Sequence, residues 1–299
     1  MERVKRAIAG QPVFPLVKAE LWLGTQLFQQ AGCRDTLENH IQLAEQLGQD
    51  LICLPVTDDI TDKPDLGYRY FNPKDLGDVF RIGDWFITAV IDGPFQLMAN
   101  QIGLMAVLTA WACKREEIIG AYAKLQAETL DLIQRCLDQG VHAVVIADDL
   151  AADRAPLIDP KDIDTLCTGF YNQAVALIHS AGGSALLHSC GCLTALMPLI
   201  RAWRMDGLAA VQQGANDLVA LHAAFDGQFV LMAGIESDML EIEGPSLSGL
   251  TAFENTVGTL GLKGGLILSS SCGLYRGNFF DRIQSIYARA DRLLLPKKQ

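Results

Sequence analysis

Short apolar runs alternate with longer amphipathic segments along most of the chain. Eight β-rich runs are candidate strands, at residues 13–22, 51–56, 85–95, 141–149, 184–190, 205–213, 228–236 and 264–272. Segments with helical spacing follow them, for example residues 36–48 and 160–183, and both of these end at glycines. Apolar strands that alternate with helices indicate a parallel sheet covered on both faces.

Eight strand–helix units in 299 residues predict an α/β fold, a (β/α)₈ TIM barrel that forms one domain over residues 1–299. A doubly wound open sheet is the structural rival, but no G-x-G-x-x-G pattern follows the first candidate strand. Residues 1–10 read as a short helix before the barrel, and we expect this helix to cover the bottom of the barrel.

Composition excludes several classes of partner. The chain has 24 lysines and arginines and 35 aspartates and glutamates, so its formal net charge is 24 − 35 = −11. It also lacks a basic stripe, so nucleic acid and anionic lipid are not expected partners. No apolar run approaches a membrane span, and the first residues lack a secretory signal, so we expect a cytoplasmic protein. Its eight cysteines should then stay reduced, and most of them, such as Cys53 and Cys136, should be small core residues.

Polar or reactive residues stand at the carboxyl ends of the candidate strands. They are Glu20, Asp58, Asp59, Asp92, Asp148, Asp149, His188, Cys190, Gln212, Glu236 and Cys272. Each one alone is weak evidence, because loops begin where strands end. In a barrel, however, these ends meet at one mouth, where such enzymes carry out their chemistry. Together they predict an acidic pocket that contains cysteine.

The segment SALLHSC carries the sharpest chemical signal. Residues two apart in a strand point the same way, so His188 and Cys190 should project together. Catalytic zinc takes three protein ligands from histidine, cysteine or a carboxylate, and Cys272 at another strand end is a third candidate. Cys192 is a nearer rival. The spacing alone leaves open that these are buried thiols beside a hydrogen-bonded histidine. The other histidines, which we expect to be structural or at the surface, are His40, His142, His179 and His222.

In several segments, which include the SALLHSC segment, the chain resembles the uroporphyrinogen decarboxylase superfamily. The resemblance is closest to its cobamide-dependent methyltransferase branch. The resemblance is carried by residues 3–13, 92–97, 147–160, 178–191, 232–237 and 264–273. In the methyltransferase branch, which includes methylcobamide:coenzyme M methyltransferases, an H-x-C pair and a distant cysteine bind zinc. The resemblance implies that His188, Cys190 and Cys272 do so here. In the decarboxylase branch, a histidine commonly replaces the late cysteine, and zinc is not used.

The resemblance also implies a reaction. It implies methyl transfer from a methylated corrinoid (a methylcobamide or cobalamin), held by a separate corrinoid protein, to a zinc-activated thiol. True decarboxylases carry an arginine-bearing segment near the N-terminus, whereas residues 18–25 here read KAELWLGT. A substrate rich in carboxylates needs cationic partners, so this departure disfavours decarboxylation. The alternatives are a decarboxylase with an unusual entrance and a barrel that binds a corrinoid or tetrapyrrole without turnover.

Further roles are expected at the mouth. The candidate catalytic residues are Asp148 and Asp149, to orient the zinc-bound histidine or bind substrate, and Glu20. Glu20 and Glu236 are each candidates for a displaceable fourth ligand. Helix capping is the competing explanation for the two aspartates. The candidate substrate-binding residues are Asp92, Gln212, Glu236, Tyr275 and Arg276. Because the strand ends are mostly acidic, we expect neutral or amino-bearing thiols as acceptors, unless Arg276 or Arg154 turns inward to meet an anionic tail.

Overall fold

The protein is described by a computed structural model over residues 1–58, 67–113, 116–225, 227–241, 244–276 and 279–295. Eight parallel strands form one sheet in the order β1-β8-β7-β6-β5-β4-β3-β2. The strands are β1 (Val17–Lys18), β2 (Leu51–Val56), β3 (Phe86–Asp92), β4 (Ala143–Ala147), β5 (Ser184–His188), β6 (Gly207–Val211), β7 (Val230–Ile235) and β8 (Leu266–Ser270). All eight candidate strands are confirmed, although β1 is much shorter than the apolar run that predicted it.

The sheet curls until its two ends meet. The backbone N–H of Asp50, just before β2, donates to the carbonyl oxygen of Lys18 in β1 at 2.8 Å. The N–H of Lys18 in turn donates to the Asp50 carboxylate at 3.0 Å. The eight strands therefore form a nearly closed barrel, which confirms the predicted (β/α)₈ fold and rules out the open-sheet rival.

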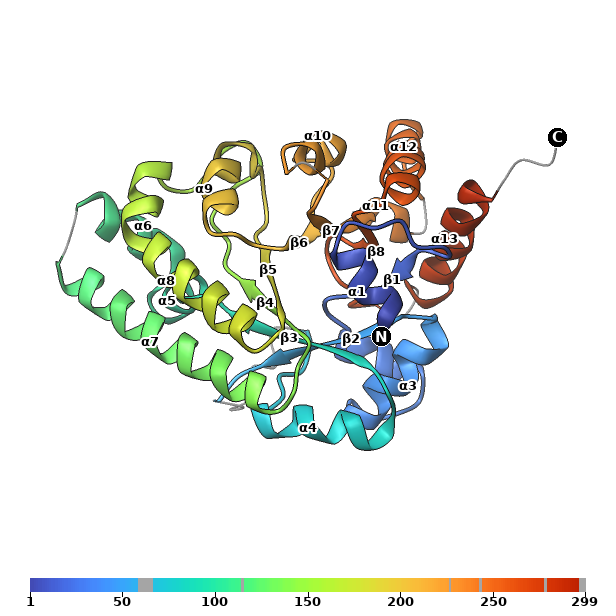
Figure 1. Ribbon diagram of the computed structural model, residues 1–299, viewed down its shortest axis with the longest axis horizontal. Helices are drawn as coiled ribbons and strands as arrows, with labels where there is room; N and C mark the ends of the chain where they lie inside the picture. Colours follow the sequence, from blue (N-terminus) through green and yellow to red (C-terminus); the bar gives the residue numbers. More distant parts are fainter. Residues whose placement is uncertain (59–66, 114–115, 226, 242–243, 277–278, 296–299) are drawn as a thin grey trace.

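Helices form an outer layer around the strands (Figure 1). They are α2 (Thr25–Gln30), α3 (Leu37–Leu47), α4 (Pro73–Ile82), α5 (Pro94–Ile102), α6 (Leu104–Ala112), α7 (Glu116–Asp138), α8 (Pro160–Ser180), η2 (Thr194–Leu196), α9 (Met197–Ala202), α10 (Leu218–Ala223), α11 (Ser237–Leu240), α12 (Leu247–Lys263) and α13 (Phe279–Leu294). The apolar pattern did not predict α2, α4 or α11. The start of α4 nevertheless has a sequence signal, a capping box between Asn72 and Asp75 with Pro73 at the first helical position.

Strand side chains divide into two buried layers. In β2, Leu51 and Cys53 face the barrel interior, whereas Ile52 and Leu54 pack against the surrounding helices. The first helix, α1 (Glu2–Ile8), adds buried apolar side chains such as Val4 to the interior layer. The short N-terminal helix therefore covers the bottom of the barrel, as predicted. In the described part of the chain, every helix is too short or too polar to cross a membrane.

Candidate functional site

A cavity of about 350 Å³ opens at the carboxyl ends of the strands. Several of the predicted site residues line it: Asp92, Asp149, His188, Cys190, Gln212, Cys272 and Tyr275. The lining also includes Trp22, Tyr68, Tyr70, Gln96, Asn100, Ala147 and Ser271. A cavity of this size suits a small ligand. Asp59, which was predicted at the same mouth, lies outside the described residues.

His188 ends β5 with its imidazole fixed in one orientation. Its Nδ1 lies 2.8 Å from the carbonyl oxygen of Ala209 in β6, and because a carbonyl can only accept, Nδ1 carries the proton. The Nε2 atom is therefore left with a lone pair. Burial lowers the pKa of His188, which favours the neutral ring. Trp22 packs edge-on against this ring, with centroids 4.7 Å apart.

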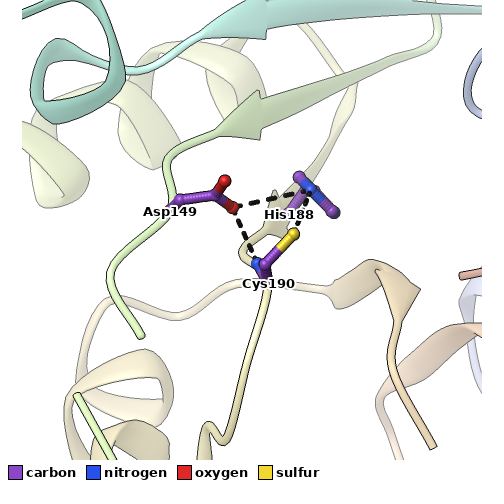
Figure 2. A group of neighbouring side chains, drawn as sticks. All are labelled: Asp149, His188 and Cys190. Atoms are coloured by element: carbon purple, nitrogen blue, oxygen red, sulfur yellow. Dashed lines mark hydrogen bonds and ion pairs between the residues drawn. The ribbon is translucent and has the colours of Figure 1, made fainter. Parts of the chain in front are cut away.

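His188 Nε2 lies beside two other possible metal ligands, Asp149 and Cys190. Figure 2 shows the side chains of Asp149, His188 and Cys190 lying together. Their ligand atoms are all within 4.8 Å of one another. Cys190 Sγ is 3.8 Å and Asp149 Oδ1 is 3.7 Å from His188 Nε2. Nitrogen, sulfur and carboxylate oxygen are the donors that zinc prefers, and a backbone carbonyl on the other ring nitrogen is the usual support for a zinc-bound histidine. The residues present therefore fit a zinc ion.

Cys272 lines the same cavity but is not part of the compact cluster. Its Sγ donates to the carbonyl oxygen of Gly273 at 3.3 Å. Tyr275 lines the cavity with both thiols, and burial raises the pKa of its phenol. Cys192, the rival third ligand, is not in the lining, and its Sγ interacts with Thr194 Oγ1 at 3.6 Å.

Both cavity cysteines need a cation to ionise near neutral pH. Burial raises the pKa of Cys190 to about 12, and the charge of Asp149 adds to the effect. Burial likewise raises the pKa of Cys272 to about 12, with a further contribution from Glu20. Because the thiolate is the form that binds metal and acts as a nucleophile, the two side chains are inert thiols until a metal displaces their protons.

The turn that carries Cys190 is held by hydrogen bonds from three directions. The Cys190 N–H donates to Asp149 Oδ1, and the Gly191 N–H donates to Gln212 Oε1, both at 2.7 Å. The Asn216 amide donates to the carbonyl oxygen of Gly191 at 2.8 Å. Gly191 has φ +83°, and a Cβ there would lie 2.4 Å from the Ala152 carbonyl oxygen, so the turn requires glycine.

The two adjacent aspartates at the end of β4 have different positions. Asp149 faces the cavity, whereas Asp148 is fully buried outside it. Asp148 accepts from the Gln96 N–H at 2.7 Å and from the Tyr171 hydroxyl at 2.8 Å, and burial raises its pKa to about 7. Asp148 thus joins α5 and α8 to the barrel and does not line the cavity, and its catalytic role stays a prediction.

Glu20 is also buried behind the site. It is 1% exposed and accepts from the Tyr287 hydroxyl at 2.8 Å and from both the N–H and the hydroxyl of Ser270. The Ser270 hydroxyl oxygen accepts in turn from the Gly273 N–H at 3.0 Å. Glu20 lies outside the cavity lining and supports the segment that carries Cys272, and its role as a fourth ligand stays a prediction.

Other predicted residues lie away from the cavity. Arg276 is exposed and pairs with Glu241 at 2.9 Å, so the structure gives no support to its predicted role in binding substrate. Glu236 lies in a neighbouring hollow, where its carboxylate accepts from the Gln213 N–H. Asp58 pairs with Arg135, which lowers the Asp58 pKa. Arg154 is exposed. The remaining histidines, His40, His142, His179 and His222, are likewise outside the cavity lining.

Three aromatic residues of the lining were missed from the sequence. Tyr68 and Tyr70 lie between the second and third candidate strands, where no element was predicted, although their i, i+2 spacing places both on one side of an extended segment. Trp22 lies two residues after Glu20, yet only Trp22 lines the cavity, so the spacing did not reveal it. The Tyr70 hydroxyl donates to Asp92 at 2.8 Å and lies 3.3 Å from the Tyr68 hydroxyl. These rings form one wall of the cavity.

Comparison with known proteins agrees with this architecture. The family model described as uroporphyrinogen decarboxylase (URO-D) matches residues 82–291. A solved methyltransferase from Methanosarcina mazei superposes with a TM-score of 0.74 at 14% identity, covering 98% of each chain. A putative vitamin-B12 independent methionine synthase from Listeria monocytogenes gives 0.56 at 14% identity, covering 96% of this chain and 99% of that one. At such identities these structures show a shared fold alone. No curated protein matches the sequence.

Proposed function

Because the chain belongs to the uroporphyrinogen decarboxylase family, we propose that it is a zinc-dependent methyltransferase of that family. It would move a methyl group from a methylated corrinoid, carried by a corrinoid protein, to a small thiol. One observation carries the proposal: the hydrogen bond from His188 to Ala209 leaves Nε2 free to bind a metal beside Cys190 and Asp149. That arrangement suits an ion that activates sulfur.

The proposed ligands are His188 Nε2 and the sulfurs of Cys190 and Cys272, with an Asp149 oxygen beside them. When bound, zinc supplies the positive charge that keeps an acceptor thiol deprotonated near neutral pH. Asp149 also holds the Cys190 N–H, and Gln212 holds the next N–H along the chain. These contacts keep the Cys190 sulfur pointed into the cavity, so the site is preorganised before any substrate enters.

The cavity dimensions support a division between the two substrates. About 350 Å³ accommodates a small acceptor, whereas a corrin macrocycle is too large and must meet the acceptor at the mouth. The proton of the acceptor thiol leaves to water there. The sulfur electron pair then forms the bond to the methyl carbon, while the carbon–cobalt bond breaks and leaves its electron pair on cobalt. Trp22 and the cavity tyrosines shield the reacting sulfur from water.

The charge of the lining favours this reaction over decarboxylation of a porphyrinogen. In the part of the chain that the structure describes, the lining contains Asp92 and Asp149 but neither lysine nor arginine. A substrate that carries many carboxylates would need cationic partners, preferably the paired donors of arginine. A small thiol that carries no carboxylates has no such requirement.

The proposal is tested with the purified, zinc-loaded protein, methylcobalamin and a panel of thiols. We expect a loss of the methyl–cobalt absorbance that depends on zinc and on the thiol, and that is faster when the methyl group is presented on a corrinoid protein. Cys192→Ser should retain this activity, and Cys272→Ser should lose it. Decarboxylation of uroporphyrinogen without methyl transfer, or corrinoid binding without any turnover, would contradict the proposal.

A further inference from the structure

Resting on the proposed function, we propose further that the thiol acceptor carries an ammonium group, which binds against Asp92, Tyr70 and Tyr68. The acceptor would place its sulfur at His188 and Cys190 and its cationic end at this second group of side chains. The substrate class is then a short aminothiol, and Asp92 is the residue that selects it.

The register of the barrel sets the reach of such an acceptor. Asp92 is paired with Ala147 across β3 and β4, and Ala147 is paired with His188 across β4 and β5. Asp92 and His188 are thus level with each other and two strands apart, roughly 10 Å between backbones. Both side chains line the same cavity. The side chains of Asp92 and His188 shorten this distance. A short acceptor, with its sulfur and nitrogen separated by two carbon atoms, would span the gap that remains between their tips.

The hydroxyl groups beside Asp92 are oriented to receive a donor. The Tyr70 hydroxyl uses its hydrogen on Asp92 Oδ2 at 2.8 Å. In the 3.3 Å contact between the two tyrosines, the Tyr68 hydroxyl must therefore be the donor, which leaves its oxygen lone pairs for another group. An ammonium has three N–H donors and no acceptor, so it can contact the Tyr68 oxygen and the Asp92 carboxylate together.

The wall around this position also favours a cation. The Tyr68 ring lies 6.0 Å from Trp22, 5.4 Å from Tyr70 and 6.0 Å from Tyr275, centroid to centroid, and aromatic faces attract cations. Burial raises the pKa of Tyr68 to about 12, and the charges of Asp92 and Asp149 contribute, so both carboxylates act on this phenol.

The charge of a bound metal does not reverse this preference. Two thiolates from Cys190 and Cys272 would cancel the charge of Zn²⁺, and His188 is neutral. Among the described residues of the lining, Asp92 and Asp149 are then the carboxylates that set the charge. Arg276, the predicted partner for an anionic tail, is held outside by Glu241. A sulfonate or carboxylate tail would therefore meet like charge.

The test compares three thiols that differ only in the terminal group: 2-aminoethanethiol, 2-mercaptoethanol and 2-mercaptoethanesulfonate. Their dissociation constants are measured by calorimetry on the zinc-loaded protein at pH 7, and kcat/KM is measured with methylcobalamin. We expect the ammonium thiol to bind about tenfold more tightly than the hydroxyl thiol, and the sulfonate thiol to bind most weakly. Asp92→Asn should remove most of the ratio between the ammonium and hydroxyl thiols. Asp164→Asn, an exposed aspartate on α8, should keep that ratio.

Two outcomes separate this inference from the proposed function. If methyl transfer proceeds but the sulfonate thiol is preferred, or if Asp92→Asn leaves the ratio unchanged, the inference is wrong and the proposed function stands. If no thiol is methylated but calorimetry still shows an ammonium preference that depends on Asp92, the cation site stands and the methyltransferase proposal fails.

Discussion

His188 donates its Nδ1–H to the carbonyl oxygen of Ala209, the residue paired with it across β5 and β6. The bond lies next to an irregularity in β6, where the register shifts between Ala209 and Val211 and Ala210 adopts φ 51°. Bulges of this kind often occur where strand ends contribute to a site. The backbone of a neighbouring strand thus fixes the tautomer of the proposed metal ligand.

Replacing His188 tests whether this lone pair holds a metal. We expect His188→Ala to reduce the zinc content from about one ion per chain to a small fraction, because the site loses its nitrogen ligand. Elemental analysis after dialysis measures this, with circular dichroism to verify the fold. His179→Ala is the matched control, because His179 is exposed outside the cavity and pairs with Asp206. Equal zinc contents in the two variants would contradict the assignment.

A pair of conservative substitutions can decide which cysteine is the third zinc ligand. Cys272→Ser should weaken zinc binding by more than the roughly 10–100-fold that loss of a supporting partner costs. Cys192→Ser should bind zinc as the unmodified protein does, because Cys192 is outside the lining and contacts Thr194. Competition with a chromogenic chelator gives both affinities. If Cys272→Ser retained full affinity, Asp149 would replace Cys272 in the ligand set.

Much of the fold could be predicted because a parallel barrel leaves a strong signal. Each of its strands is buried on both faces and ends at a common mouth, so apolar runs and their polar ends mark the units. The alternation of inward-facing and outward-facing residues along a strand could also have shown which polar residues at the strand ends enter the cavity. In β4, Ala143, Val145 and Ala147 face the interior, and continuing this alternation places Asp149, not Asp148, in the cavity. The same reasoning places Glu20 outside, since Val17, Ala19 and Leu21 face inward.

The remainder of the site depends on contacts that no local pattern encodes. Tyr68 reaches the cavity from a segment without periodicity, and Asn216 supports Gly191 across 25 residues of sequence. Arg276 was a plausible cavity residue by its position after Cys272, but its side chain pairs with Glu241 on the surface. The direction of a loop side chain follows from tertiary packing, so the sequence could nominate Arg276 without placing its side chain.

Glu20 should make the stability of the fold depend on pH. Its pKa is raised from 4.5 to about 7 by burial, so between these values the native state keeps a proton that the unfolded chain releases. The stability that comes from this group is fully present below pH 4.5, declines as the pH rises to about 7, and is constant above that. Glu20→Gln removes the decline, so the unfolding free energy of the variant relative to the unmodified protein should rise by on the order of 3 kcal/mol from pH 4.5 to pH 8.

Urea unfolding at several pH values measures this difference. Glu2→Gln is the control, because Glu2 is exposed in the first turn of α1 and should give a curve parallel to that of the unmodified protein. The slope with pH is the diagnostic quantity, since Glu20→Gln also alters the hydrogen bonds to Ser270 and Tyr287 by an amount that does not depend on pH. A Glu20→Gln curve parallel to that of the unmodified protein would show that folding does not raise the pKa of this carboxyl.

Two glycines with similar backbones and different surroundings test how tightly the turn beside Cys190 is held. Gly191 has φ +83° and Gly182 has φ +75°, so an alanine at either position carries the cost of a left-handed backbone, about 1–2 kcal/mol. A Cβ at Gly182 meets nothing within 4 Å, whereas a Cβ at Gly191 would lie 2.4 Å from the carbonyl oxygen of Ala152. The clash involves backbone on both sides, so no side chain can move to relieve it. The same carbonyl accepts from the Cys192 N–H at 2.8 Å, so moving it would disturb the turn twice.

We therefore expect Gly182→Ala to lose only the cost of the backbone conformation and to bind zinc normally. Gly191→Ala should lose more unfolding free energy and should also bind zinc more weakly, because the turn must shift and carry the Cys190 sulfur away from His188. Urea unfolding and a zinc titration of both variants measure the two effects. If the two variants lost equal stability and bound zinc equally well, the turn would be adaptable, and the position of Cys190 would have to be set by the metal itself.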